Sequence, residues 1–360
     1  MITLATGLIA GLKLGDRLEK AVKYANDNAI NLTLINFVTE LGRTNQKDYK
    51  YYLDQNDYAL EPSRKFTYSK IKQIIRDIHG RSRGANIIVR APATVEYDHI
   101  NIKFKDHKII KETIDPDLIV TFIDSEWLIK DRLQKDYDKD PYLYSLVEYF
   151  KNFTVEDILD WMDEEVSLSE DWAEYLNIPH VVLAVGEPIE SIVKLTTVKN
   201  VPKFYASYPM THATPEERKQ INKIIKRLDR HGVVVDPGAI EIDQNRKMSP
   251  EEKRAIYEYT VHRDLHWDVK KVDALIAIQP SKDKPAFSWG VTSEIDHARG
   301  YGKEIYVYKR TEGGPFGPGQ AFPIENWFNT EEKLFRSISK KYPQLKLKKT
   351  ALYLKEDGIN

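Results

Sequence analysis

Residues 273–309 read DALIAIQPSKDKPAFSWGVTSEIDHARGYGKEIYVYK, and this stretch decides the fold class. It begins with an apolar run, passes through a loop that contains glycine, continues as a helix-forming segment and ends in a second apolar run. A strand, a helix and a strand in this order indicate two parallel strands joined by a helical crossover. Glu294 lies where the loop becomes the helix, and neither element explains why an acid is there.

The same alternation runs through the chain in two series. Apolar runs typical of strands form the first series at 2–5, 30–37, 85–92, 117–124 and 180–186, and the second at 203–209, 233–238, 273–280 and 304–309. Helical segments are expected at 14–26, 68–80, 125–136, 137–171, 188–198, 215–232, 249–271 and 331–340. Strands that alternate with helices predict an α/β protein with two three-layer domains and mainly parallel sheets.

A short basic joint, KNVPK at 199–203, separates the two series. A chain of 360 residues has room for two domains. We therefore expect one domain over 1–198, a second over 199–345, and a tail over 346–360.

Composition narrows the class of protein. A formal net charge of −1 gives no overall field that attracts nucleic acid, and the absence of cysteine excludes disulfides, thiolate metal sites and cysteine nucleophiles. The apolar part of the first residues is too short for a membrane span and lacks a basic leader. His262 and His266 are four residues apart, but no acidic third ligand accompanies them. We expect a cytoplasmic protein without a bound metal, a nucleic-acid partner or a membrane partner.

The first strand-to-helix turn, TGLIAGLKLGD at 6–16, has the context of a phosphate-binding loop. When the pattern G-x-x-x-x-G-K-[ST] is aligned from Gly7, Lys13 matches its lysine. Leu12 replaces the second glycine, and Leu14 replaces the hydroxyl residue that holds Mg²⁺. Gly11 restores some backbone freedom. The alternative is an ordinary turn that contains glycine.

The order of elements over residues 1–197 resembles the archaeal-type adenylate kinase family. The similar stretches are NIIVRAPATVEY at 86–97, DPDLIVTFIDSEWLIKDRL at 115–133 and NIPHVVLAVGEPIESIVKL at 177–195. The resemblance implies a P-loop kinase-like domain that binds ATP or another adenine nucleotide with Mg²⁺. It implies nucleotide contacts from Gly7, Gly11, Lys13, Arg90 and Arg132. The alternative for each cation is a solvated surface charge.

In the second series, Glu294 and Asp264 are the candidate catalytic acids. Loops at the carboxyl ends of parallel strands share one edge, so Glu294 is expected near Ser207 and Tyr208. A carboxylate at a helix N-terminus is stabilised in its ionised form, and an ionised glutamate can attack an anomeric carbon. Asp264 would protonate or orient the leaving base, or position the sugar. The alternative is a helix-capping acid and an exposed helix charge.

Residues 201–310 resemble the nucleoside 2-deoxyribosyltransferase superfamily. Two stretches carry the resemblance: VHRDLHWDVKKVDALIAI at 261–278, and SWGVTSEIDHARGYGKEIYVY at 288–308. In that family an aspartate, matched by Asp264, precedes a glycine loop and a nucleophilic glutamate, matched by Gly290 and Glu294. The resemblance implies a Rossmann-like fold, no required cofactor and an active site that is often completed across subunits of a homo-oligomer.

The form S-x-G-V-x-x-E is most similar to the 2'-deoxynucleoside 5'-monophosphate N-glycosidases of that superfamily. Ser288 stands where transferases on free nucleosides tend to have an aspartate, which implies a nucleotide substrate. The implied substrate contacts are Ser207, Pro209, Ser288, Trp289 and Gly290. The hydroxyl that assists the nucleophile would come from Tyr205 or Tyr208, and Asp296 replaces the family's glycine.

These patterns support three hypotheses. The first is an enzyme that cleaves or exchanges the N-glycosidic bond of a (deoxy)nucleoside 5'-phosphate through a glycosyl-Glu294 intermediate, with an accessory or regulatory nucleotide-binding domain. The second is a nucleotide-sensing protein without catalysis. The third is a bifunctional nucleotide kinase and deoxyribosyltransferase of nucleotide salvage.

Overall fold

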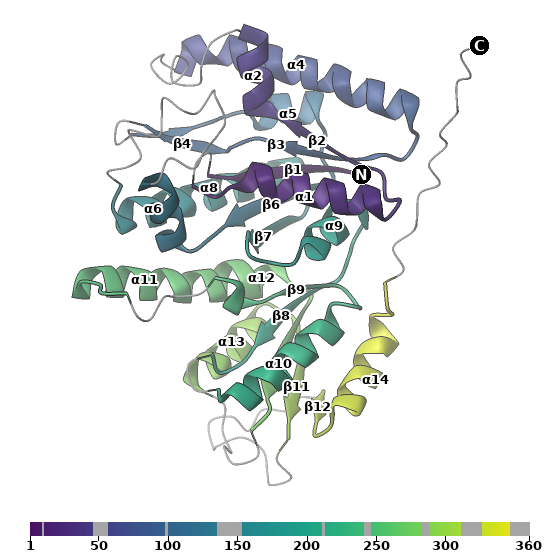
Figure 1. The fold of residues 1–360 in the computed structure, drawn as a ribbon, viewed down its shortest axis with the longest axis vertical. Coiled ribbons are helices and arrows are strands. Elements are labelled where there is room, and N and C mark those ends of the chain that lie inside the picture. Colours follow the sequence, from purple (N-terminus) through teal and green to yellow (C-terminus); the bar gives the residue numbers. More distant parts are fainter. Residues whose placement is uncertain are drawn as a thin grey trace.

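The computed structural model describes residues 1–8, 11–45, 57–97, 100–134, 153–210, 213–240, 246–281, 288–310 and 326–345. Two five-stranded sheets with parallel neighbouring strands lie at opposite ends of the molecule (Figure 1). The predicted α/β class with two mainly parallel sheets is confirmed. The predicted tail, 346–360, lies outside the described residues.

The first sheet has β1 at its centre. In spatial order its strands are β2 (Leu32–Asn36), β3 (Asn86–Arg90), β1 (Ile2–Gly7), β6 (Leu118–Ile123) and β7 (His180–Ala184). Its helices are α1 (Leu14–Asp27), α2 (Phe37–Asn45), α4 (Asp57–Arg81), α5 (His107–Thr113), α6 (Glu126–Gln134), α8 (Val155–Leu176) and α9 (Ile189–Thr197). Every position of β6 is buried, as expected of a strand that is covered on both faces. A separate antiparallel hairpin, β4 (Thr94–Tyr97) with β5 (Ile100–Lys103), was not expected from the sequence.

The second sheet has β10 at its centre. In spatial order its strands are β12 (Trp327–Phe328), β11 (Glu304–Lys309), β10 (Ala274–Gln279), β8 (Lys203–Ser207) and β9 (Val233–Val235). Its helices are α10 (Pro215–Leu228), α11 (Pro250–His262), α12 (Val269–Lys271), α13 (Trp289–Gly300) and α14 (Glu331–Lys341). Adjacent residues of β8 point to opposite faces: Phe204 packs with residues of α10 and α14, and Tyr205 packs with residues of α12 and α13.

The expected single α-helix over 249–271 is wrong. It is divided by a π-helical segment, Arg263–Asp268, that lies between α11 and α12. Arg263, Asp264 and Asp268 are buried there. The alternative of an exposed helix charge for Asp264 is therefore also wrong. Extra residues in a π turn are often found at functional sites, because they redirect side chains that an α-helix would place elsewhere.

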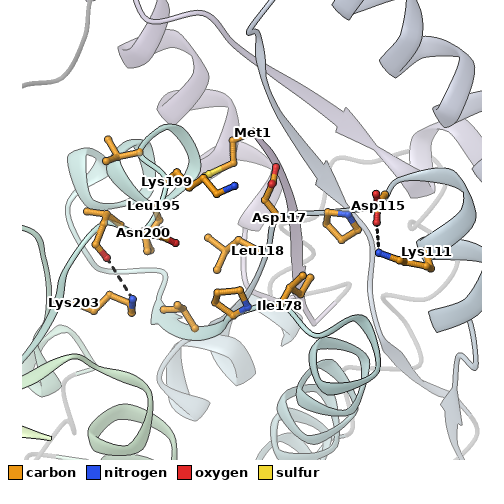
Figure 2. Close-up of a pocket in the computed structure, with 15 residues that line it drawn as sticks. Met1, Lys111, Asp115, Asp117, Leu118, Ile178, Leu195, Lys199, Asn200 and Lys203 are labelled. Carbon is orange, nitrogen blue, oxygen red and sulfur yellow. Dashed lines mark hydrogen bonds and ion pairs between the residues drawn. The ribbon is translucent and has the colours of Figure 1, made fainter.

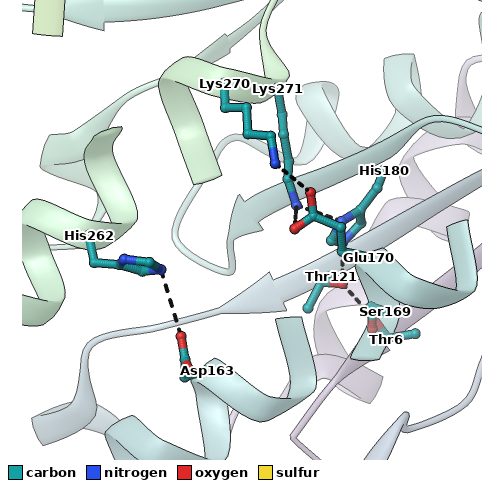
Figure 3. A network of polar contacts seen from close by, with 9 residues as sticks. All are labelled: Thr6, Thr121, Asp163, Ser169, Glu170, His180, His262, Lys270 and Lys271. Carbon is teal, nitrogen blue, oxygen red and sulfur yellow. Dashed lines mark hydrogen bonds and ion pairs between the residues drawn. The ribbon is translucent and has the colours of Figure 1, made fainter. Parts of the chain in front are cut away.

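The two halves share a continuous hydrophobic core. Buried residues of the second half, including Val233, Ile256 and Trp267, belong to the same cluster as the core of the first sheet. Polar contacts cross the same boundary (Figure 3). Lys271 Nζ lies 2.6 Å from His180 Nδ1 and 3.2 Å from Glu170 Oε2. Burial, with the nearby lysines, lowers the pKa of His180 well below its ordinary value, so its neutral ring accepts from the ammonium group.

A cavity of about 320 Å³ opens beside these contacts, since Pro179 and Val181, which flank His180, line it (Figure 2). Met1, Leu118 and Lys203 line it, and these residues stand at the amino ends of β1, β6 and β8. Ligands of parallel sheets bind at the carboxyl ends of strands, so the candidate site is sought at the opposite edge. Among the helices that the structure describes, none is long and apolar enough to cross a membrane.

Candidate active site at the carboxyl edge of the second sheet

Glu294 lies inside α13, one turn later than the sequence predicts. The helix begins at Trp289, and the hydroxyl of Ser288 accepts the Val291 N–H at 3.4 Å as an N-cap. The first turn of α13 contains no acid. The expectation that the helix dipole keeps Glu294 ionised is therefore wrong, because the dipole acts within the first turn.

Two hydroxyl groups of β8 hold the Glu294 carboxylate. The Tyr205 hydroxyl donates to Oε1 at 3.0 Å, and the Ser207 hydroxyl donates to Oε2. Tyr205 and Ser207 are two residues apart on one strand, so both side chains point to the face that α13 covers. The sequence left the assisting tyrosine open between Tyr205 and Tyr208, and the observed hydrogen bond is made by Tyr205.

The environment of Glu294 favours its protonated form. Burial, followed by the negative charges of Asp264 and Asp268, raises the pKa of Glu294 from 4.5 to about 8, against the lowering effect of the bonds from Ser207 and Tyr205. Burial raises the pKa of Asp268 to about 8 as well. Three acidic side chains therefore share one desolvated space, and they cannot all be ionised at low energetic cost near neutral pH.

Arg263 is the buried cation of this cluster. Its Nη2 lies 2.8 Å and its Nε 2.9 Å from Asp264 Oδ1, and its Nε lies 3.9 Å from Asp268 Oδ2. Its side chain is only 3% exposed. Burial still raises the pKa of Asp264, although the guanidinium opposes that shift. The arrangement offers a carboxylate that can attack and a neighbouring carboxyl group that can exchange a proton.

Tyr208 lies at the same edge of the sheet, but its hydrogen-bond partner is Asp236. Its hydroxyl donates to Asp236 Oδ1 at 2.6 Å, and burial with that carboxylate raises the pKa of the tyrosine. Pro209, next in sequence, is buried. At the start of α13, Trp289 is 73% exposed, and a Cβ added to Gly290 would meet nothing within 4 Å. Trp289 and Gly290 thus border open space.

The turn after β1 is filled by the protein itself. Leu12 and Leu14 are buried, and a Cβ added to Gly7 would lie 3.0 Å from Leu12 and 3.3 Å from Leu14. The N–H of Gly7 donates at 2.8 Å to Glu165 of α8, which also accepts from Ala93 and Thr94. A buried leucine in place of the loop hydroxyl does not fit a Mg²⁺-nucleotide cradle.

The predicted phosphate-binding cations have other neighbours. Arg132 donates to the carbonyl oxygen of Gly11 at 3.0 Å and to Asp124 at 2.7 Å. Arg90 lies against α1, since a Cβ added to Gly15 would be 2.9 Å from its Nη1. Lys13 is exposed, with a left-handed backbone at φ 52°. Lys13 and Arg90 thus lie near the start of α1, whereas Arg132 helps to close the loop.

Sequence reasoning missed Arg263, Asp268, Asp236, Glu187 and Glu165. Asp268 follows Asp264 by four residues, which is a helical spacing, and Arg263 adjoins Asp264; this local signal could have been used. No local signal marks Glu165, which is 158 residues from Gly7. Within the described part of the chain, no group of three or more histidine or acidic side chains could hold a metal ion.

No family model and no curated protein matches the chain. It is similar to the solved structure of shikimate kinase from Bacteroides thetaiotaomicron, with 8% identity and a TM-score of 0.32 over 64% of this chain and 98% of that one. It is also similar to a 2-desoxiribosyltransferase from Leishmania mexicana, with 14% identity and a TM-score of 0.26 over 39% of this chain and 99% of that one. Both are enzymes, and the likeness to each is one of fold alone.

Proposed function

We propose that the second half of the chain cleaves or exchanges the N-glycosidic bond of a (deoxy)nucleoside 5'-phosphate. One observation carries the proposal: two hydroxyl groups hold Glu294 beside the buried Asp264–Arg263 pair. Paired carboxyl groups with different surroundings are what a retaining glycosyl transfer requires, because one attacks and the other moves a proton.

The reaction proceeds in two steps. Ionised Glu294 attacks C1', the bond from C1' to the base nitrogen breaks, and the base leaves with the bonding electrons and a proton from Asp264. Water then attacks C1', gives its proton to Asp264 and releases Glu294, which leaves sugar phosphate and base. A second base in place of water gives base exchange.

Tyr205 and Ser207 aim the nucleophile. Each hydroxyl donates to a different oxygen of Glu294, so the carboxylate is fixed in direction before substrate binds. Fixed orientation removes the entropic cost of arranging the reacting atoms. The same bonds limit the rise in the pKa of Glu294.

The start of α13 is the proposed site for the 5'-phosphate. The first N–H groups of a helix lack internal partners and attract anions. Gly290 leaves space there for a phosphate to approach the backbone. Trp289 is mostly exposed, and we expect it to cover the bound nucleotide.

Base release tests this function. The purified chain is incubated with nucleosides and with their mono-, di- and triphosphates, and free base is measured by chromatography. We expect release from a nucleotide, abolished in Glu294→Ala and retained in Asp296→Asn, an exposed acid on the same helix. Unchanged release in Glu294→Ala would show that the proposed mechanism is wrong.

We further propose nucleotide binding without phosphoryl transfer in the first half. The motivating observation is the placement of Lys13, Arg17 and Arg90 around the first turn of α1, next to a loop that does not fit Mg²⁺. Calorimetry of the full chain with adenine nucleotides, with and without Mg²⁺, tests it. Equal binding in both conditions supports it, and no heat at millimolar nucleotide contradicts it. The expected homo-oligomer is checked by light scattering.

A further inference from the structure

A residue of the first half reaches the carboxyl edge of the second sheet. Glu187, in the turn between β7 and α9, accepts the N–H of Asp236 on its Oε1 at 2.7 Å. Asp236 directly follows β9, the neighbour of β8. Glu187 is only 3% exposed, so this contact is built into the joint between the halves.

Asp236 extends this contact toward the candidate nucleophile. Its Oδ1 accepts the Tyr208 hydroxyl at 2.6 Å and the Gly238 N–H at 2.9 Å. Tyr208 directly follows Ser207 in the sequence, and the Ser207 hydroxyl donates to Glu294. A chain of hydrogen bonds and one peptide link therefore runs from Glu187 to Glu294.

The backbone around this series of hydrogen bonds is tightly packed. A Cβ added to Gly186 would lie 2.6 Å from the carbonyl oxygen of Ala239, and one added to Gly238 would lie 2.5 Å from the Tyr208 hydroxyl. Glu187 is also anchored in its own half. Its N–H donates to Ala184 at 3.1 Å, and its carbonyl oxygen accepts from Arg17.

We propose that Glu187 is a positioning residue for the reaction at Glu294, contributed by the other half of the chain. It fixes the end of β9, which fixes Tyr208 and hence the end of β8 that aims the nucleophile. This inference rests on the proposed function. Displacements of about 1 Å in such a support can lower a rate about 100-fold. The first half thus has a role at the second site that does not need a working phosphate loop.

Three variants of the full chain test the proposal. Glu187→Ala removes the acceptor, and we expect kcat for base release to fall about 10- to 100-fold while KM for the nucleotide changes much less. Glu187→Gln keeps an acceptor oxygen and restores kcat to within about threefold of the wild type. Lys270→Met is the matched control, because its ion pair with Glu170 crosses the same boundary and involves neither Asp236 nor Tyr208. Its kcat stays near that of the wild type.

Hydrogen exchange gives a readout that does not depend on activity. In Glu187→Ala, we expect faster exchange at the ends of β8 and β9, and in Lys270→Met no change there. An active wild type with unchanged kcat in Glu187→Ala, or an equal loss in Lys270→Met, overturns the positioning role. An inactive wild type contradicts the proposed function instead. In that case, hydrogen exchange still tests whether Glu187 fixes the ends of β8 and β9. Unchanged exchange in Glu187→Ala would overturn this structural role too.

Discussion

At the scale of single residues, the protonation of Glu294 links stability to pH. Its pKa is about 8 in the folded protein, above the ordinary 4.5, so the folded state holds a proton that unfolding releases between these values. The contribution of this group to stability is therefore lost as the pH rises through that window.

Glu294→Gln is expected to gain stability relative to the wild type as the pH rises from 5 to 9, because an amide does not ionise. The gain at high pH should be about 1–2 kcal/mol, well below the full value of the pKa shift, since the amide keeps only part of the hydrogen bonding. Urea denaturation at pH 5, 7 and 9 measures it. A difference between the two proteins that does not vary with pH would contradict the raised pKa.

Asp268 is expected to contribute to the pH dependence of base release, which burial of Glu294 mainly sets. The nucleophile acts in its ionised form, so the rate should rise with pH toward about 8. Asp268→Asn removes a charge that is only partly developed at these pH values and should shift this rise to lower pH by a fraction of a pH unit. The profile of kcat/KM from pH 5 to 10 measures the shift, with Asp296→Asn as the control. A profile that stays in place would exclude coupling between the two carboxyl groups.

At the scale of elements, the π-helical segment depends on its one buried cation. Arg263→Met leaves Asp264 and Asp268 without a counter-charge and should lower the free energy of unfolding by about 3–5 kcal/mol. Arg254→Met is the matched control on α11, because Arg254 forms an exposed pair with Glu258 and its loss should change stability little. Chemical denaturation compares the two. Similar losses would show that the buried cluster is not held by Arg263.

The turn after β1 is expected to behave as core rather than as a phosphate loop. Leu14→Ser returns a hydroxyl to the position of the loop serine, yet it removes a fully buried side chain and should cost about 2–4 kcal/mol. Leu128→Ser, on an exposed face of α6, should change stability little. Thermal unfolding measures both. Phosphoryl transfer gained by Leu14→Ser would contradict this interpretation.

At the scale of the whole molecule, the two halves are expected to unfold together. Their cores are continuous, and a partly buried ion pair and a hydrogen bond cross the boundary. Domains with such a shared core lack independent stability. Calorimetry should therefore show one transition whose calorimetric and van't Hoff enthalpies agree. Two separate transitions would show that each half is stable alone.

Local pattern was enough to predict much of this architecture. Alternating apolar runs predicted the strands of the first sheet and four of the five strands of the second, because strand and helix periodicities are properties of neighbouring residues; β12 was missed. The family resemblance carried by Asp264 and the segment 288–294 also singled out two acids that the structure places in one partly buried cluster. The hairpin β4–β5 was missed, since short runs give a weak periodic signal.

Contacts between distant residues decided the rest. Tyr205 lies 89 residues from Glu294, and Glu165 lies 158 residues from Gly7, so no local pattern could pair them. The sequence led us to expect an ionised Glu294, whereas the folded structure favours its protonated form. The causes are burial and the charges of Asp264 and Asp268, which exist only once the chain has folded. The sequence by itself determined most of the strands and helices and the candidate reactive side chains; the tertiary structure decided their partners and their charge, since desolvation depends on what the whole fold brings together.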